Sequence, residues 1–491
     1  MKNTTIKTLG ELKKSNYQSL SIKDELRKNL MKQMETKSTV FKGIYGYEDT
    51  VIPNMERAIL ARHSINLLGL RGQAKTKIAR LMTELLDEYI PVIEGSEVND
   101  DPLNPLSKYG RDLKAKMGDA LPISWLHRSE RYLEKLATPD VSIADLIGDV
   151  DPIRAANLKL DYSDERVIHF GLIPRANRCI FVINELPDLQ ARIQVALFNI
   201  LQEGDIQIRG FQLRFPLDIQ FIFTANPEDY TNRGAIITPL KDRIQSQIMT
   251  HYPKNIELAK EITKKEAKLS KDQLKQVLVP EILKDLLEQI TFEARESEFV
   301  DEKSGVSARL SISAYEVLIS AAERRMIMNR EKQTTARISD LMNVIPAIIG
   351  KIEMVYEGEQ EGATNVSYAL IRSALRQQSI RFFPELKDLK KKDNKQSKVY
   401  AKIMSWFNSN QLDLSNDASD EKYAKQLSKV EGLKEAVKGK FPQLPQKAQL
   451  LMMEYLLHAM AEYSLLSKAQ LERSFEFGDL FSSIFNAQEN N

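Results

Sequence analysis

One short segment constrains the fold of this chain more than any other stretch of its sequence. It reads Gly69-Leu70-Arg71-Gly72-Gln73-Ala74-Lys75-Thr76. The apolar residues 65–68 come directly before it, and a helical pattern over residues 78–82 follows it. A buried strand, a glycine-containing loop and a helix in this order bring backbone N–H groups together at a helix N-terminus, where anions are stabilised. The segment therefore predicts a phosphate-binding loop.

The residue types in this loop suit contact with a nucleotide and its metal ion. Lys75 would reach the β- and γ-phosphates, and the Thr76 hydroxyl would hold Mg²⁺. Ala74 departs from the usual pattern, because a second glycine normally stands there and alanine disfavours a positive φ. The added methyl group is small, so we expect the loop to keep its shape. The residues expected to bind ATP are Gly69, Gly72, Gln73, Ala74, Lys75, Thr76 and Lys77.

A second apolar run, residues 179–183, ends in the polar pair Asn184 and Glu185. In a P-loop protein this strand end presents the acid on the Mg²⁺ side and the general base. We interpret Glu185 as the base that polarises the attacking water, and we place Asn184 beside the metal with Thr76. Aspartate is usual at position 184; asparagine still accepts a hydrogen bond but brings no charge. The alternative is an ordinary strand end with two exposed polar residues.

Further polar residues are candidates for the same site. Asn226 follows another apolar run, and we expect it to orient the water between the general base and the γ-phosphate. Arg243 comes shortly after it, where an arginine commonly enters a neighbouring subunit's site and stabilises transition-state charge; Arg233 is a second candidate for that role. Arg309 starts a helix and could couple the γ-phosphate to the angle of a helical lid. For each arginine, a surface salt bridge is the alternative.

The order of the apolar runs predicts the domain organisation. Up to about residue 253, short apolar runs (residues 89–93 among them) alternate with amphipathic stretches, which is typical of βαβ units around a parallel sheet. From about 256 the pattern is helical. We therefore predict an α/β P-loop core with a parallel sheet, then an all-helical lid and a helical C-terminal region. The expected parts are an N-terminal helical extension (1–40), the nucleotide-binding domain (41–255), the lid (256–385), a charged linker (386–398) and a helical C-terminal domain (399–491).

Composition excludes several other classes of protein. The 70 basic and 68 acidic residues give a net charge of +2, which provides no general attraction to nucleic acid or to anionic membranes. The single cysteine, Cys179, excludes an intramolecular disulfide and a thiolate metal site, and we expect it to be a small buried hydrophobe. No apolar run reaches the roughly 18 residues of a membrane span, and the N-terminus lacks a signal-peptide core. The expected location is cytoplasmic.

Taken in order, these motifs resemble those of AAA+ ATPases of the magnesium chelatase I-subunit and MoxR type, the helix-2 insert clade. The resemblance covers about residues 41–355. Within it, residues 145–152 resemble the start of the family's helix-2 insertion, and residues 171–178 resemble the helix before its second acidic motif. Residues 206–215 alternate in character and predict a β-hairpin. In the family this is the pre-sensor hairpin, which works on a partner together with the insertion.

The resemblance implies MgATP hydrolysis, a hexameric ring with sites between subunits, and a partner that carries a von Willebrand A-type domain. This chain contains no Asp-x-Ser-x-Ser metal-adhesion motif, so that domain is not fused to it. Such a ring would remodel a client protein or load metal into it, and the sequence does not identify the client.

Two other functions are alternatives, and the sequence leaves the role of the C-terminal region open. The neutral Asn184 motivates a nucleotide-dependent assembly scaffold with little hydrolysis. A DNA remodeller would use Arg209 and Arg214 of the predicted hairpin, but the near-zero net charge argues against nucleic-acid binding. The C-terminal region is either a helical domain that packs on the lid or a module that docks a client or partner.

Overall fold

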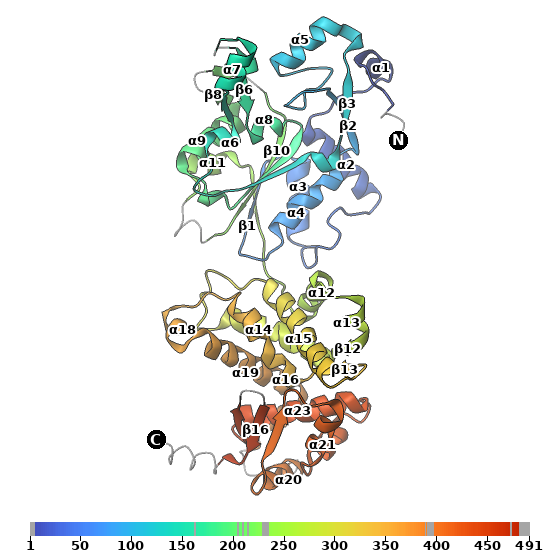
Figure 1. The fold of residues 1–491 in the computed structure, drawn as a ribbon, viewed down its shortest axis with the longest axis vertical. Coiled ribbons are helices and arrows are strands. Elements are labelled where there is room, and N and C mark those ends of the chain that lie inside the picture. Colours follow the sequence, from blue (N-terminus) through green and yellow to red (C-terminus); the bar gives the residue numbers. More distant parts are fainter. Residues whose placement is uncertain are drawn as a thin grey trace. The chain divides into compact units, whose positions relative to one another are not determined.

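The computed structural model describes residues 5–161, 164–203, 206–208, 211–213, 216–227, 235–387, 389, 397–471 and 474–480. These residues form two compact units, Met1–His251 and Tyr252–Asn491 (Figure 1). No helix within the described ranges is both long and apolar enough to cross a membrane.

The first unit is built around a five-stranded parallel sheet with the order β11-β1-β10-β7-β4. Every residue of β1 and β10 is buried. Such continuous burial is expected for parallel strands that are covered on both faces, and it explains why their sequences are mainly apolar. The predicted α/β core with a parallel sheet is confirmed. The strands are β1 (Ile65–Leu68), β4 (Tyr132–Leu136), β7 (Cys179–Asn184), β10 (Ile219–Ala225) and β11 (Ser246–Met249).

Helices cover both faces of this sheet (Figure 1). On one face, Leu67, Val182 and Ile222 pack in a cluster with α2 (Ile22–Glu35), α3 (Val51–Leu60) and α4 (Lys75–Leu81). On the other face, strand residues that alternate with these pack with α6 (Ile143–Leu146), α8 (Leu172–Arg175), α9 (Ala191–Glu203) and α11 (Thr238–Arg243). The alternation follows from the period of two along a strand.

The strand expected at residues 89–93 exists but lies outside the five-stranded sheet. This strand, β2 (Tyr89–Ile93), pairs antiparallel with β3 (Ile123–His127). The two strands flank α5 (Lys108–Met117) and pack with α1 (Leu9–Lys14) in a small separate cluster. An apolar run predicts a buried strand but does not specify its neighbours, which is why the pairing was wrong.

Two smaller elements stand at the places that the resemblance indicates. β5 (Gly148–Val150) and β6 (Ile168–Phe170) form an antiparallel pair on either side of α7 (Pro152–Leu158). β8 (Ile206–Ile208) and β9 (Phe211–Leu213) form an antiparallel pair, so the predicted hairpin is confirmed in its two strands. Arg209 and Arg214 lie outside the described residues.

The helix α2, predicted as part of an N-terminal extension, is tied to the core of the first unit. The carboxylate of Glu25 pairs with the guanidinium of Arg131 through two hydrogen bonds of 2.7 Å, and both side chains are buried. Glu25 also accepts a hydrogen bond from the Asp87 backbone N–H at 2.6 Å. Because a buried charge is stable only when it is paired, this contact fixes α2 against the sheet.

The second unit is mainly helical around one continuous apolar core, which runs from residues near 277 to residues near 477. The longest helices of this core are α14 (Glu281–Glu296), α15 (Arg309–Met328), α19 (Ala363–Phe382) and α23 (Gln446–Glu462). Around them lie α12 (Ile256–Glu266), α13 (Lys271–Gln276), α16 (Ile338–Leu341), α17 (Ile345–Ile349), α18 (Tyr356–Glu361), α20 (Ser397–Phe407), α21 (Asp420–Ser428) and α22 (Leu433–Lys440).

The second unit also contains strands that the helical prediction did not include. β12 (Val277–Leu278) and β13 (Thr334–Thr335) form a short parallel pair in the lid region. β14 (Leu412–Ser415), β16 (Ser474–Gly478) and β15 (Ser467–Gln470) form an antiparallel sheet in that order. These strands have only two to five residues, which is too short for a pattern on the scale of a helix to reveal them.

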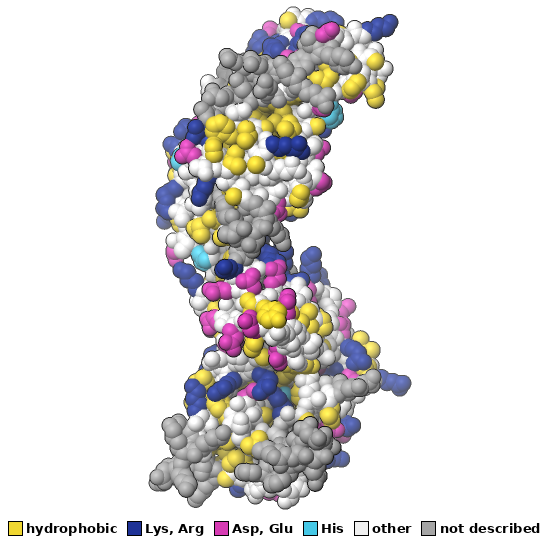
Figure 2. Space-filling view, turned by 90° about the vertical axis from the view of Figure 1, so that its left-hand side faces the viewer, with side chains coloured by type: hydrophobic (Ala, Val, Ile, Leu, Met, Phe, Trp, Pro, Cys, Tyr) yellow, Lys and Arg dark blue, Asp and Glu magenta, His cyan; other side chains and the backbone are white. Residues whose placement is uncertain are grey.

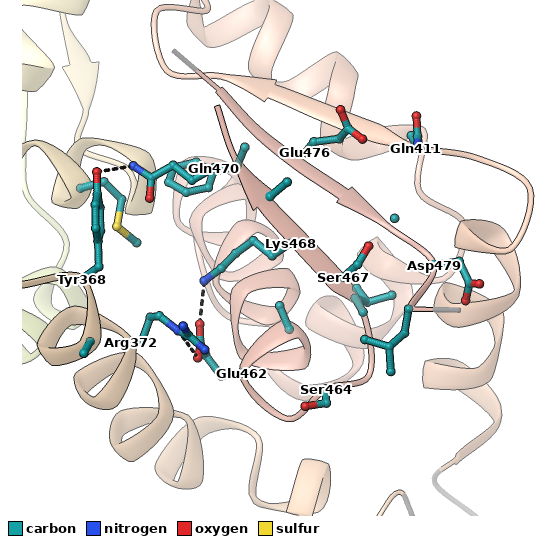
Figure 3. Close-up of a pocket in the computed structure, with 18 of the residues that line it drawn as sticks. Tyr368, Arg372, Gln411, Glu462, Ser464, Ser467, Lys468, Gln470, Glu476 and Asp479 are labelled. Atoms are coloured by element: carbon teal, nitrogen blue, oxygen red, sulfur yellow. Dashed lines mark hydrogen bonds and ion pairs between the residues drawn. The ribbon is translucent and has the colours of Figure 1, made fainter. Parts of the chain in front are cut away.

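Side-chain contacts join the lid region to the C-terminal region (Figure 3). Glu462 accepts hydrogen bonds from Arg372 of α19 at 3.0 Å and from Lys468 of β15 at 2.6 Å. Gln470 donates to the Tyr368 hydroxyl at 2.6 Å across the same cavity of about 900 Å³. With the shared apolar core, these bonds join the described parts of the lid and C-terminal regions within one compact unit.

Candidate nucleotide-binding site

The predicted phosphate loop connects the end of β1 to the start of α4 at Lys75. Two of its residues have positive φ: Gly72 at 74° and Ala74 at 57°. Ala74 has ψ of 16°, so its backbone is left-handed, the conformation that glycine adopts without cost at this kind of position. Alanine therefore keeps the shape of the loop, as expected, but under local backbone strain.

The loop packs tightly against the end of β11. The Thr250 hydroxyl donates to Gln73 Oε1 at 2.6 Å, and a Cβ on Gly69 would collide with both of these oxygen atoms. Position 69 therefore requires glycine because of the close approach of its neighbours. The Tyr47 hydroxyl lies 3.1 Å from the Gln73 carbonyl oxygen and 2.7 Å from the His251 carbonyl oxygen. The contribution of Tyr47 could not be expected from the sequence, because Tyr47 lies in a segment without a recognised motif.

Two lysines of the loop hydrogen-bond to backbone carbonyls. Lys75 is only 8% exposed, and its ammonium donates to the carbonyl oxygens of Gly69 and, at 3.1 Å, of Leu70. This position at the mouth of the loop is where a phosphate would compete for the ammonium. Lys77 donates to the Gly43 carbonyl at 3.1 Å and ties the helix to residues before α3.

The ends of β7 and β10 meet the loop, as parallel strands in one sheet require. Thr76 Oγ1 donates to Asn184 Oδ1 at 3.3 Å. Thr224 of β10 donates to the same oxygen at 3.2 Å and accepts the Glu185 backbone N–H at 3.2 Å. The structure thus brings together three predicted site residues through Thr224, a residue for which the sequence suggested no role.

Glu185 and Asn226 complete this edge of the sheet. Glu185 has φ of 55° and ψ of 50°, so it leaves the strand in the left-handed region. Such strain in a residue other than glycine persists only where its surroundings hold it. Asn226 is 7% exposed, and its Oδ1 has no hydrogen-bond partner within the described part of the chain. A buried oxygen without a partner, directly after the end of β10, fits a site that binds a water or ligand group.

Arg243 and Arg309 take part in none of the hydrogen bonds described above. Arg243 ends α11, pairs with Asp242 and stacks 5.1 Å from the centre of the Phe198 ring. Arg309 is exposed at the first residue of α15, in the second unit. Arg233 lies outside the described residues. Cys179 is fully buried in β7, and burial raises the pKa of its thiol to about 12, so it is a structural residue as expected.

Comparison with known proteins gives two distant relatives with curated names. A magnesium-chelatase 38 kDa subunit of Cereibacter sphaeroides is 26% identical over 210 residues, which are 41% of this chain and 55% of that protein. Its counterpart in Rhodobacter capsulatus is 23% identical over 229 residues, 46% of this chain and 59% of that protein. The shared segment thus spans little more than half of either relative. No protein-family model matches the chain.

Among solved structures, the BchI–BchD complex of magnesium chelatase from single-particle cryo-EM contains a chain with 19% identity and a TM-score of 0.34; 65% of this chain and 98% of that one are covered. The Holliday junction branch migration motor RuvB of Thermotoga maritima has 10% identity and a TM-score of 0.33, with 68% and 74% covered.

The sheet order, the phosphate loop after β1 and the polar ends of β7 and β10 give the first unit the α/β P-loop fold that AAA+ proteins have. In sequence, the chain is a distant relative of the magnesium-chelatase 38 kDa subunits.

Proposed function

We propose that this chain binds MgATP, hydrolyses it, and works as a subunit of a ring that remodels a partner protein or loads metal into it. One observation carries the proposal. The amide oxygen of Asn184 accepts hydrogen bonds from the hydroxyls of Thr76 and Thr224 at the phosphate loop, and Thr224 also accepts the backbone N–H of Glu185. A loop that cradles phosphates and a carboxylate beside it are the two parts that phosphoryl transfer to water requires.

The chain's own residues have distinct tasks in this reaction. The loop N–H groups and the Lys75 ammonium would bind the phosphates, and Thr76 with Asn184 would hold Mg²⁺, which neutralises phosphate charge when bound. Glu185 would accept a proton from the attacking water. Asn226, whose buried oxygen has no partner among the described residues, would orient that water.

The proposal is tested by steady-state ATPase assays of the wild type, Glu185→Gln and Lys75→Ala. We expect Glu185→Gln to bind a fluorescent ATP analogue normally and to turn over about 10²- to 10⁴-fold more slowly, the range for loss of a general base. Lys75→Ala should lose nucleotide affinity. Wild-type turnover no higher than that of Glu185→Gln would show that the hydrolysis proposal is wrong.

A nucleotide-dependent assembly scaffold is the second candidate, and Asn184 favours it. Its amide oxygen accepts two hydroxyl hydrogen bonds but brings no negative charge to a metal ion. A scaffold of this kind would assemble on binding ATP and release it unchanged. The scaffold function is supported if the wild type binds nucleotide and assembles but turns ATP over no faster than Glu185→Gln.

A ring with sites shared between subunits is tested by mixing two inactive variants. Arg243→Ala should bind nucleotide without hydrolysing it, because the arginine would serve the neighbouring site. A Lys75→Ala subunit has a defective phosphate loop but still carries Arg243, which could serve the site of its neighbour. A mixture of the two should regain activity, since some interfaces then pair an intact loop with an intact arginine. Absence of complementation, together with a monomeric mass in ATP by native mass spectrometry, would contradict the ring and its expected six subunits.

The lid role of Arg309 and the proposed partner need separate tests. Arg309→Ala should keep nucleotide affinity and lose turnover if Arg309 acts on the γ-phosphate from the second unit. A partner with a von Willebrand A-type domain, if purified from the same source, should co-elute with the chain in ATP and separate from it in ADP. If the two proteins co-elute equally in ATP and in ADP, the binding of the partner is not controlled by ATP hydrolysis.

DNA remodelling has the weakest support. On the face drawn in Figure 2, Lys and Arg side chains are scattered among acidic and apolar ones rather than gathered in a stripe. The sequence carries a net charge of only +2. Salt-sensitive DNA binding that is lost in the Arg209→Ala, Arg214→Ala double variant would revive this function.

A further inference from the structure

Thr224 lies near the end of β10, next to the end of β7 where the candidate residues Asn184 and Glu185 stand. It is the sixth residue of the seven-residue strand β10 and is 1% exposed. Its hydroxyl contacts one polar group of each neighbouring candidate: the amide oxygen of Asn184 and the backbone N–H of Glu185, each at 3.2 Å. The register of β10 against β7 fixes this position, because Phe223 pairs with Ile183 and the next residues of the two strands are Thr224 and Asn184.

The direction of these bonds is determined by the donors available. The Glu185 N–H can only donate, so the Thr224 oxygen accepts it. The single hydroxyl proton of Thr224 is directed to Asn184, which presents its carbonyl oxygen to it rather than its NH₂ group. That orientation also provides the acceptor for Thr76 at 3.3 Å. Thr224 therefore sets which end of the neutral amide faces the phosphate loop.

The same hydroxyl holds the backbone of Glu185 in an unfavourable conformation. Glu185 has φ of 55°, which costs free energy for any residue with a Cβ. In this left-handed conformation, the Glu185 N–H donates to the Thr224 hydroxyl at the strand end, and this hydrogen bond offsets part of that free-energy cost. A valine at position 224 would keep the shape of the side chain but remove both bonds.

We propose that Thr224 is a positioning residue for the reaction: its hydroxyl orients the Asn184 amide toward Thr76 and the Glu185 backbone toward the attacking water. This inference rests on the proposed MgATP hydrolysis. Thr224 itself touches neither substrate nor metal in this role. Its effect should therefore appear in turnover and in Mg²⁺ dependence rather than in nucleotide affinity at saturating Mg²⁺.

The test uses the full chain with Thr224→Val, Thr224→Ser and the control Thr291→Val. Thr291 is equally buried, with 1% exposure, but lies in α14 of the second unit. For Thr224→Val we expect kcat to fall about 100-fold while KM for ATP stays within about twofold, the pattern for misplacement of a reacting group. Thr224→Ser, which keeps the hydroxyl, should recover most of the loss, and Thr291→Val should match the wild type.

A second readout does not need turnover. The Mg²⁺ concentration for half-maximal binding of a fluorescent ATP analogue should rise about tenfold in Thr224→Val, as for loss of a partner that orients a metal ligand. Thermal unfolding confirms that each variant is folded. If wild-type turnover does not exceed that of Glu185→Gln, hydrolysis fails as the function, and the Mg²⁺ titration alone decides whether Thr224 orients Asn184. Wild-type behaviour of Thr224→Val in both assays, or equal damage in Thr224→Ser, would overturn the proposal.

Discussion

The hydroxyl of Thr76, at the start of α4, donates a hydrogen bond of 3.3 Å to the amide oxygen of Asn184, at the end of β7. An aspartate at position 184 would accept the same bond with a negative charge. A carboxylate charge close to the cation would also attract it by about 1 kcal/mol even in water-like surroundings. We therefore predict that Asn184→Asp lowers the Mg²⁺ concentration for half-maximal ATP binding roughly fivefold, the equivalent of that attraction. A Mg²⁺ titration with a fluorescent ATP analogue measures it.

The matched control is Asn104→Asp, which adds the same charge at an exposed loop position of the first unit. It should leave the Mg²⁺ dependence unchanged. Equal shifts in both variants would mean that an added negative charge favours Mg²⁺ binding from anywhere on the first unit, and that position 184 has no special effect.

The backbone of Ala74 predicts a stabilising substitution. Its left-handed conformation costs about 1–2 kcal/mol for a residue with a Cβ, whereas the extra chain entropy of glycine costs about 0.5–1 kcal/mol. We predict that Ala74→Gly raises the free energy of unfolding by up to about 1 kcal/mol, measured by urea denaturation. Ala79→Gly, one turn into α4, should lower it by about 1 kcal/mol because a helix interior disfavours glycine. If both variants lose stability, the strain at position 74 is absent.

The buried pair of Glu25 and Arg131 predicts a large loss of stability when it is broken. Their side chains are 5% and 1% exposed. Removing one partner leaves an uncompensated buried charge, so Glu25→Gln should lower the free energy of unfolding by about 3–5 kcal/mol. The neighbouring Asp24, which pairs with Arg62 at the surface, provides the control: Asp24→Asn should cost less than about 1 kcal/mol. Similar losses in the two variants would contradict the view of α2 as part of the core.

The sequence predicted the elements whose signal is local. The phosphate loop was recognisable because strand, loop and helix follow one another within residues 65–81, and the buried strands β7 and β10 because both faces are covered. The strands β4 and β11 gave no such signal. They are the edge strands of the sheet, and β4 carries Glu134 and Lys135 at partly exposed or exposed positions.

Features that depend on pairing across the chain could not be predicted. Glu25 and Arg131 are 106 residues apart, and no local pattern connects them. Thr224 gained its role from the register of β10 against β7, which sets its hydroxyl beside Asn184 and Glu185. The sequence identified the candidate site residues one strand at a time; the hydrogen bonds that join them follow from the sheet order.

Burial of Glu288 in α14 predicts a pH-dependent term in stability. This glutamate is 2% exposed, and burial raises its pKa to about 6, although hydrogen bonds from Thr263 and Ser311 act in the opposite direction. The folded-state pKa lies above the unfolded value of 4.5, so the folded state holds the proton more tightly. The resulting stabilisation is complete below about pH 4.5 and is lost as the pH rises through about 6, a change of about 2 kcal/mol.

Glu288→Gln mimics the protonated carboxyl group at every pH. Urea unfolding between pH 4.5 and 8 should therefore show the variant about 2 kcal/mol more stable than the wild type at pH 8, with the difference closing toward pH 4.5. The exposed Glu302→Gln should show no such divergence. The comparison between variant and wild type cancels other groups that titrate in this range. A constant difference across the pH range would mean that Glu288 stays ionised in the folded protein, held by the hydroxyls of Thr263 and Ser311 more strongly than burial opposes it.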